Sequence, residues 1–289
     1  MKKLLALFMV IAMVLSLAAC TTSEESSSKK KGAASISAPI TFQETVVVDN
    51  DACTIKITEV DPDGRFGYSL SVYLENKTEN TNLMFSVTSA STNGVTNDPF
   101  WAASVDAGKK SNETITFMDT DLAEIIGDYT DIALSFRVYD NDDYMADPVA
   151  EPTVRIYPYG EDKAVTYTRQ SQETDTVILE NDKVSAIVIG YEEDDILGYV
   201  ANVYLLNNTD VPVMFAVDSA SVNGYMADPY FATIVEAGTC AFAQISWSDS
   251  TLSENNIENV EEIELTLRAY DSENWLADDF ANETVTLYP

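Results

Sequence analysis

The stretch YLENKTENTNLMFSVTSASTNG, Tyr73–Gly94, occurs a second time in the chain as YLLNNTDVPVMFAVDSASVNG, Tyr204–Gly224. The copies lie 130 to 131 positions apart, and 12 of the 21 aligned residues are identical once one residue is deleted from the second copy. At the same offset, FRVYD at 136–140 matches LRAYD at 267–271. The chain therefore holds two copies of one unit of about 115 residues, which is long enough to bury its own core.

Within each copy, large apolar residues occupy every second position of several runs. IALSFRVYD, 132–140, has this alternation, and its counterpart IELTLRAYD, 263–271, keeps it. A period of two predicts strands with one face on a core and the other in water. Turn signals such as Asp63-Gly64 and Asn93-Gly94 separate about seven or eight such runs per copy. We therefore predict an all-β fold, two tandem immunoglobulin-like antiparallel β-sandwiches after a signal peptide and flexible tether.

One segment per copy is expected to be helical. In the first copy it runs from Asp119 to Gly127, with Asp119 or Thr120 as the cap and Gly127 as the stop. Its counterpart begins at Asp249.

The N-terminus has the features of a secretory signal. Lys2 and Lys3 precede an apolar run that is too short to cross a bilayer as a helix, and LAAC, 17–20, closes it. Residues 21–40 are rich in Ser, Lys, Gly and Ala, so we expect a flexible tether. The expected organisation is a signal peptide at 1–19, a lipidated Cys20 with a linker at 20–40, and β-sandwich repeats at 41–159 and 160–289.

The LAAC motif resembles the lipobox of bacterial lipoproteins, whose signal is removed before a cysteine that carries lipid such as palmitate. Behind this motif, the tandem units resemble the surface lipoproteins of Gram-positive bacteria with paired immunoglobulin-like domains. The resemblance covers the mature chain and implies a lipid anchor on Cys20 and a location on the extracellular face of the cell membrane. It implies no established activity. An ordinary secretory signal with an incidental cysteine is the alternative.

The composition bounds the partners and the chemistry. After residue 19, 14 Lys and Arg face 48 Asp and Glu, which works against nucleic acid as a partner and favours cationic ligands. The chain has no histidine, so it has no Ser-His-Asp triad and no imidazole-ligated zinc. Paired carboxylates for glycoside hydrolysis stay open, although 48 acids guarantee some close pairs by number alone. We predict no enzyme and no cofactor.

Two cysteines remain after Cys20, namely Cys53 and Cys240. They lie in different copies, and neither has a cysteine at the matching position of the other copy. An intradomain disulfide is therefore excluded, and two small buried thiols are predicted.

Each copy also has two loops with a shared pattern: two residues, Ala or Asn, then Asp and usually Pro. YMADP stands at 144–148 and again at 225–229, and VTNDP, 95–99, and WLADD, 275–279, are related. Asp before Pro favours an Asx-turn, so one turn chemistry can explain the recurrence. Alternatively, the loops gather at one end and bind a glycan, peptide or protein. The candidate ligand-binding residues are Tyr144, Tyr225, Tyr230, Trp275, Trp101, Asp147, Asp228 and Asp278.

Two further features concern charged side chains. Asp140, Asp142 and Asp143 offer oxygen ligands at short spacing, as a weak calcium candidate beside the alternative of a solvated acidic turn. Arg137 and Arg268 occupy matching outward positions and are predicted to pair with nearby carboxylates.

The function expected from these features is that of a membrane-anchored extracellular lipoprotein. It would be a non-enzymatic binding or adhesion module whose ligand or partner protein is not named by the sequence. The alternative is a structural spacer or an accessory subunit of a cell-envelope assembly.

Overall fold

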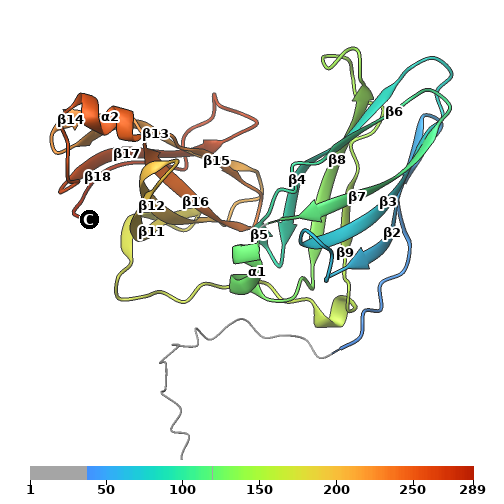
Figure 1. The fold of residues 1–289 in the computed structure, drawn as a ribbon, viewed down its shortest axis with the longest axis horizontal. Coiled ribbons are helices and arrows are strands. Elements are labelled where there is room, and N and C mark those ends of the chain that lie inside the picture. Colours follow the sequence, from blue (N-terminus) through green and yellow to red (C-terminus); the bar gives the residue numbers. More distant parts are fainter. Residues whose placement is uncertain (1–37, 119) are drawn as a thin grey trace, which may run out of the picture. The chain divides into compact units, whose positions relative to one another are not determined.

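The computed structural model describes residues 38–118 and 120–289. The predicted signal peptide, Cys20, most of the linker and Asp119 lie outside the described residues. The fold is all-β, with antiparallel sheets and two short α-helices, as predicted (Figure 1). None of the helices in the described ranges combines the length and the apolar character that crossing a membrane requires.

The described chain contains eighteen strands, and we call β1–β9 repeat 1 and β10–β18 repeat 2. Repeat 1 consists of β1 (Thr45–Asp49), β2 (Cys53–Asp61), β3 (Tyr68–Asn76), β4 (Leu83–Thr92), β5 (Val95–Thr96), β6 (Ala102–Val105), β7 (Lys110–Phe117), α1 (Thr120–Ile126), β8 (Ile132–Asp140) and β9 (Thr153–Ile156). A 3-10 helix, η1 (Glu161–Lys163), follows. Repeat 2 consists of β10 (Thr176–Glu180), β11 (Val184–Asp194), β12 (Gly198–Asn207), β13 (Val213–Val222), β14 (Tyr225–Met226), β15 (Ala232–Val235), β16 (Cys240–Trp247), α2 (Asp249–Glu254), β17 (Ile263–Asp271) and β18 (Ala281–Leu287).

Each repeat has nine strands rather than the predicted seven or eight, because β5 and β14 are only two residues long and show no alternation. In repeat 1 the first sheet has the order β1-β2-β3-β7, and in the second sheet β4 pairs with β5, β6 and β8, and β8 with β9. Repeat 2 repeats this plan with β10-β11-β12-β16 and β14-β13-β17-β18, and β15 on β13. One parallel bridge, between Cys240 and Val95, joins β16 to β5.

The core of each repeat comes from the alternation that the sequence shows. In β8, Ile132, Leu134, Phe136 and Val138 are buried and the residues between them are not. Two separate clusters of buried hydrophobic side chains result, one centred on each repeat. That the chain divides into separate domains at residues 159 and 160 stays a prediction.

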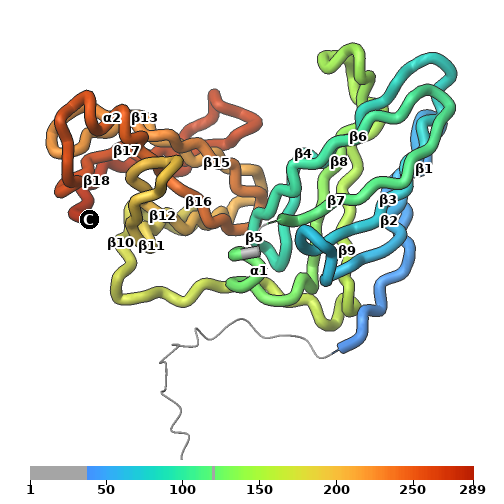
Figure 2. The backbone as a smooth tube through the Cα atoms, viewed as in Figure 1, coloured from blue at the N-terminus to red at the C-terminus, as the bar shows by residue number. Residues whose placement is uncertain are grey.

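The two ends of each sandwich are named here by their helix. Helix α1 lies between the end of β7 and the start of β8, so it marks what we call the helix pole of repeat 1, where β4 also ends. The opposite end, the far pole, holds the turns β1–β2, β3–β4 and β6–β7 and the loop after β8 (Figure 2). In repeat 2, α2 marks the helix pole in the same way. Gly127 ends α1 at a φ of 75°, as predicted, and its N–H donates to the Ala123 carbonyl.

Buried asparagines hold equivalent turns in both repeats, a feature that sequence reasoning missed. The amide nitrogen of Asn76 donates to the carbonyls of Thr81 and Val105, both at 2.8 Å. Asn207 does the same with Val211 at 2.8 Å and Val235 at 2.9 Å. Both asparagines stand where the two aligned stretches read Leu-x-Asn, so the identity of the stretches was the signal. Each side chain replaces backbone partners that the turn cannot provide.

Candidate functional site

The two copies of YMADP lie at opposite poles of their repeats. In repeat 1, β4 and β8 are antiparallel neighbours that place Leu83 opposite Asp140 and Thr92 opposite Ile132. The loop after β4 therefore lies at the helix pole and the loop after β8 at the far pole. The expectation that both loops gather at one end is wrong, because the two strands that precede them run in opposite directions.

The same geometry divides the candidates of repeat 2, where Val222 faces Ile263 and Val213 faces Asp271. The far poles hold Tyr144 and Asp147 in repeat 1, and Trp275 and Asp278 in repeat 2. The helix pole of repeat 2 holds Tyr225, Asp228 and Tyr230, all of them exposed. No single surface of either repeat contains all of its candidates.

Trp101 belongs to the core rather than to a loop surface. Its ring meets Phe136 edge to face, with centroids 6.4 Å apart, and it packs against the core cluster of repeat 1. Its backbone carbonyl accepts a hydrogen bond from the Val87 N–H at 3.0 Å. Trp101 therefore stabilises the sandwich and is not available to a ligand.

The two far-pole loops present matching pairs of exposed side chains. In repeat 1, Tyr144 is 63% exposed and Met145 is 87% exposed. At the matching positions of repeat 2, Trp275 is 70% exposed and Leu276 is 78% exposed. We call these the tip pairs. Each consists of an aromatic residue followed by a large aliphatic one, in a chain that otherwise buries most residues of this kind.

An arginine holds the base of the tip loop in repeat 1. The Arg137 guanidinium lies 4.6 Å from the ring centroid of Tyr139 and 4.5 Å from that of Tyr144. It donates to the Tyr144 carbonyl at 3.1 Å and lies 3.7 Å from a carboxylate oxygen of Glu151. The loop thus begins and ends on one cation, which orients Tyr144.

Repeat 2 uses the equivalent arginine with one change. Arg268 donates to the Asp279 carboxylate at 2.8 Å and lies 4.4 Å from the Tyr270 ring centroid. The predicted pairing of both arginines with nearby carboxylates is confirmed. The Asp279 partner sits where repeat 1 has Pro148, so each loop closes on its arginine by a different residue.

The carboxylates at the start of these loops form turns. The Asp140 carboxylate accepts from the Asp142 N–H at 2.9 Å, and the Asp143 carboxylate from the Met145 N–H at 3.1 Å. In repeat 2, Asp271 accepts from the Glu273 N–H at 2.9 Å. These are Asx-turns. Within 38–118 and 120–289, no three Asp, Glu or Cys side chains group in a way that could hold a metal ion.

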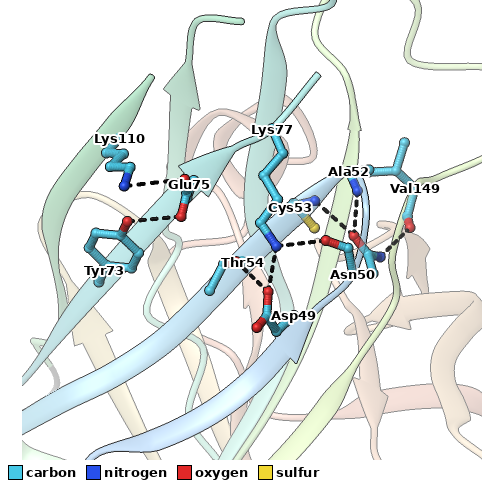
Figure 3. Close-up of polar contacts among 10 residues, drawn as sticks. All are labelled: Asp49, Asn50, Ala52, Cys53, Thr54, Tyr73, Glu75, Lys77, Lys110 and Val149. Atoms are coloured by element: carbon cyan, nitrogen blue, oxygen red, sulfur yellow. Dashed lines mark hydrogen bonds and ion pairs between the residues drawn. The ribbon is translucent and has the colours of Figure 1, made fainter. Parts of the chain in front are cut away.

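The outward face of the first sheet of repeat 1 carries a polar network (Figure 3). Lys77 forms an ion pair with Asp49 and donates to the Asn50 carbonyl at 2.7 Å. The Glu75 carboxylate accepts from the Tyr73 hydroxyl at 3.0 Å and lies 3.3 Å from the Lys110 ammonium. The hydrogen bond from Lys77 and a second one from Thr54 lower the pKa of Asp49. Each lysine of the network is matched by a carboxylate, so this face is no anion site.

The cysteines are buried and free, as predicted. Burial raises the pKa of the Cys53 thiol to about 11 and also raises the pKa of Cys240. Both thiols are therefore protonated at neutral pH and do not act as nucleophiles.

Comparisons with known proteins add no family. No family model matches the chain, and no curated protein matches it. The chain is similar to the YadV chaperone at 12% identity over 82% of this chain and 99% of that chain, with a TM-score of 0.25. It is similar to the Salmonella enterica SafA pilin in complex with the SafB chaperone at 9% identity over 83% and 98% of the chains, with a TM-score of 0.23. For red sea bream transglutaminase the identity is 10%, over 85% of this chain and 31% of that chain, with a TM-score of 0.21. Scores this low carry no argument about function.

Proposed function

We propose that this chain is a lipid-anchored extracellular protein that binds a partner protein, without catalysis, through its two tip pairs. The observation that carries the proposal is the matched exposure of Tyr144 and Met145 in repeat 1 and of Trp275 and Leu276 in repeat 2. Large apolar side chains that protrude together into water at equivalent places favour a contact surface.

The composition of the tip pairs supports a protein as the partner. Tyr and Trp are the residues that most often dominate the energy of protein interfaces, and Met and Leu fill adjacent apolar space. The side chains protrude from loops, so they fit a groove on the partner. Exposed carboxylates surround both pairs, which favours a partner with a basic rim around that groove. The carboxylates are Asp142, Asp143 and Asp147 in repeat 1, and Glu273 and Asp278 in repeat 2.

Two equivalent tips on one chain allow bivalent attachment. A partner that contacts one tip holds the other tip at a high effective concentration, so weak single contacts can add up to firm binding. The anchor supports the same function, because it would keep both tips near the cell surface. Its support is the sequence LAAC at 17–20. The Cys20→Ser variant should appear in the culture medium instead of the membrane fraction.

The binding proposal is tested by site-specific photo-cross-linking on living cells. A photoreactive amino acid replaces Met145 in one strain and Leu276 in another. The matched control replaces Phe100, which is 88% exposed and lies on the segment after β5. We expect one and the same partner to be captured from both tips and not from Phe100.

Substitution of the tips completes the experiment. The double variant Tyr144→Ser and Trp275→Ser should lose the cross-link while its melting temperature stays within about 2 °C of the unchanged protein, because the removed rings are exposed. The spacer alternative predicts no tip-specific capture. Absence of cross-links at both tips, or capture of the same protein from Phe100, would contradict the proposal.

A further inference from the structure

A pocket of about 250 Å³ opens at the helix pole of repeat 1, away from the tip pairs. Its lining includes four aromatic rings and one carboxylate, and it contains no Lys or Arg. The residues that define it are Gly67, Tyr68, Phe117, Asp128, Tyr129 and Tyr159.

A glycine explains how the rings come together. Tyr68 begins β3 and pairs with Phe117 at the end of β7. The preceding Gly67 has a φ of 127°, and a Cβ there would lie 2.1 Å from the Phe117 carbonyl oxygen. Only a residue without a side chain allows this approach. β3 can therefore start against β7, and the two rings face the same pocket.

Tyr129 completes the aromatic wall and is held from behind. Its ring stacks on Tyr68 with centroids 4.8 Å apart, and it meets Phe117 edge to face at 5.8 Å. Its hydroxyl accepts a hydrogen bond from the Asn97 amide at 3.1 Å. Tyr159 follows Pro158, whose carbonyl accepts from two backbone N–H groups of the segment before β1. The walls are thus fixed before any ligand arrives.

The polar groups of the pocket are a carboxylate and two neutral phenols. Burial raises the pKa of Tyr68, and the nearby Tyr159 and Asp128 add to the shift. Burial also raises the pKa of Tyr159, again with Asp128 next. The Asp128 carboxylate is therefore close enough to affect both phenols. In addition, the Tyr68 hydroxyl is buried and has no hydrogen-bond partner within the described residues.

We propose that this pocket binds a small organic ammonium ion, with the cation against the faces of the tyrosines and beside the Asp128 carboxylate. Aromatic faces attract such cations, and the attraction grows where water is excluded. The volume suits a head group better than a whole drug-sized molecule. An N–H or O–H group of the ligand would give the Tyr68 hydroxyl the partner that buried polar groups normally have. The acidic chain would also concentrate cations around the pocket.

Repeat 2 contains a matched control for this inference. The equivalent pocket keeps Gly198 and Tyr199 at the places of Gly67 and Tyr68. However, Val260 stands at the place of Tyr129, and Tyr199 is the single aromatic residue of its lining. Its other polar lining includes the carboxylates of Glu193, Asp194, Asp195, Asp249 and Glu258. This pocket offers charge without an aromatic cage, so it separates the two contributions.

The experiment is a ligand titration of the full-length protein by saturation-transfer NMR. The probes are tetramethylammonium chloride and methylammonium chloride, which differ in their N–H groups. Sodium chloride at the same ionic strength and uncharged tert-butanol are the controls. We expect saturable binding of at least one cation, with tert-butanol binding at least about tenfold more weakly.

Variants locate the binding. Asp128→Asn and Tyr159→Leu should each weaken the cation about tenfold, whereas Glu258→Gln in the pocket of repeat 2 should leave the affinity unchanged. Circular dichroism verifies that each variant is folded. Three results would overturn the inference: no saturable binding of either cation, equal binding of tert-butanol, or full affinity in both Asp128→Asn and Tyr159→Leu. None of them depends on whether the tip pairs bind a protein.

Discussion

Strands β2 and β11 have the same register and bulge in their two repeats, but their outward residues differ in chemistry. The bulge falls after Ile57 in β2 and after Val188 in β11. The inward residues are apolar in both strands. On the outward face, Lys56 of repeat 1 corresponds to Ile187 of repeat 2. The inward positions therefore maintain the sandwich, and the outward positions have been free to change.

The neighbouring strands show the same change and its consequence. Glu75 corresponds to Leu206, and Asn112 to Phe242. In repeat 1 this face is the polar network of Figure 3. In repeat 2, the ring of the linker residue Tyr167 lies 5.9 Å from Phe242, and Tyr204 is only 8% exposed. One sheet face is thus built for water and its equivalent for contact with other parts of the chain.

The largest expected effect tests what the repeats share. Gly67→Ala and Gly198→Ala should each cost about 3 kcal/mol or more, because the new Cβ would lie 2.1 Å from the Phe117 carbonyl and 2.3 Å from the Trp247 carbonyl. Gly108→Ala is the control, since its φ is also positive, at 69°, but its Cβ would meet nothing within 4 Å. It should cost about 1 kcal/mol. Urea denaturation measures all three, and a Gly198→Ala as mild as Gly108→Ala would show that the scaffold is not shared.

A middle-sized effect is expected from exchanging the outward residues. Phe242→Asn should cost about 2 kcal/mol, because it removes an aromatic ring from a partly buried apolar contact. The reverse change, Asn112→Phe, should alter stability by less than about 0.5 kcal/mol, since its surroundings stay open to water. Thermal unfolding compares the two variants. Equal costs would mean that the two faces do not differ in burial as described.

The smallest effect concerns the ion pair of Lys77 and Asp49. The pKa of Asp49 lies below its ordinary value of 3.8, so its contribution to stability is present above that value and is lost as the pH falls through the lowered pKa. Lys77→Met should move the pKa of Asp49 upward with little change in stability at neutral pH, because the pair is exposed. NMR titration of the carboxyl carbons checks the shift. Repeat 2 has Asn208 in place of the lysine and offers no such pair. An unchanged pKa would contradict the assigned cause.

Local patterns were sufficient for the elements and for contacts between near neighbours. The alternation in 132–140 predicted β8, and Gly127 predicted the end of α1. The pairing of Arg137 and Arg268 with carboxylates also followed, because their partners lie only 14 and 11 residues further along the chain. Residues this close in sequence meet by the local course of the backbone.

The candidate site was harder to predict, because it depends on which strands become neighbours. Periodicity tells which face of a strand is buried but not which strand lies beside it. For this reason the loops after β4 and β8 were expected together and lie at opposite poles. The pocket of repeat 1 was missed for the same reason, since Tyr68 and Tyr159 are 91 residues apart. The recurrence of Gly-Tyr at 67–68 and 198–199 was the one signal that could have drawn attention to it.

The amino-acid sequence by itself determined the duplicated all-β architecture, the buried face of each strand and the free, buried thiols, because each follows from residue spacing or from counting. Only the tertiary structure decided which loops share a pole, which outward face is covered and which aromatic rings enclose a carboxylate. These depend on antiparallel pairing between strands far apart in the chain, where the cost of closing long loops is met by the core as a whole rather than by any local segment.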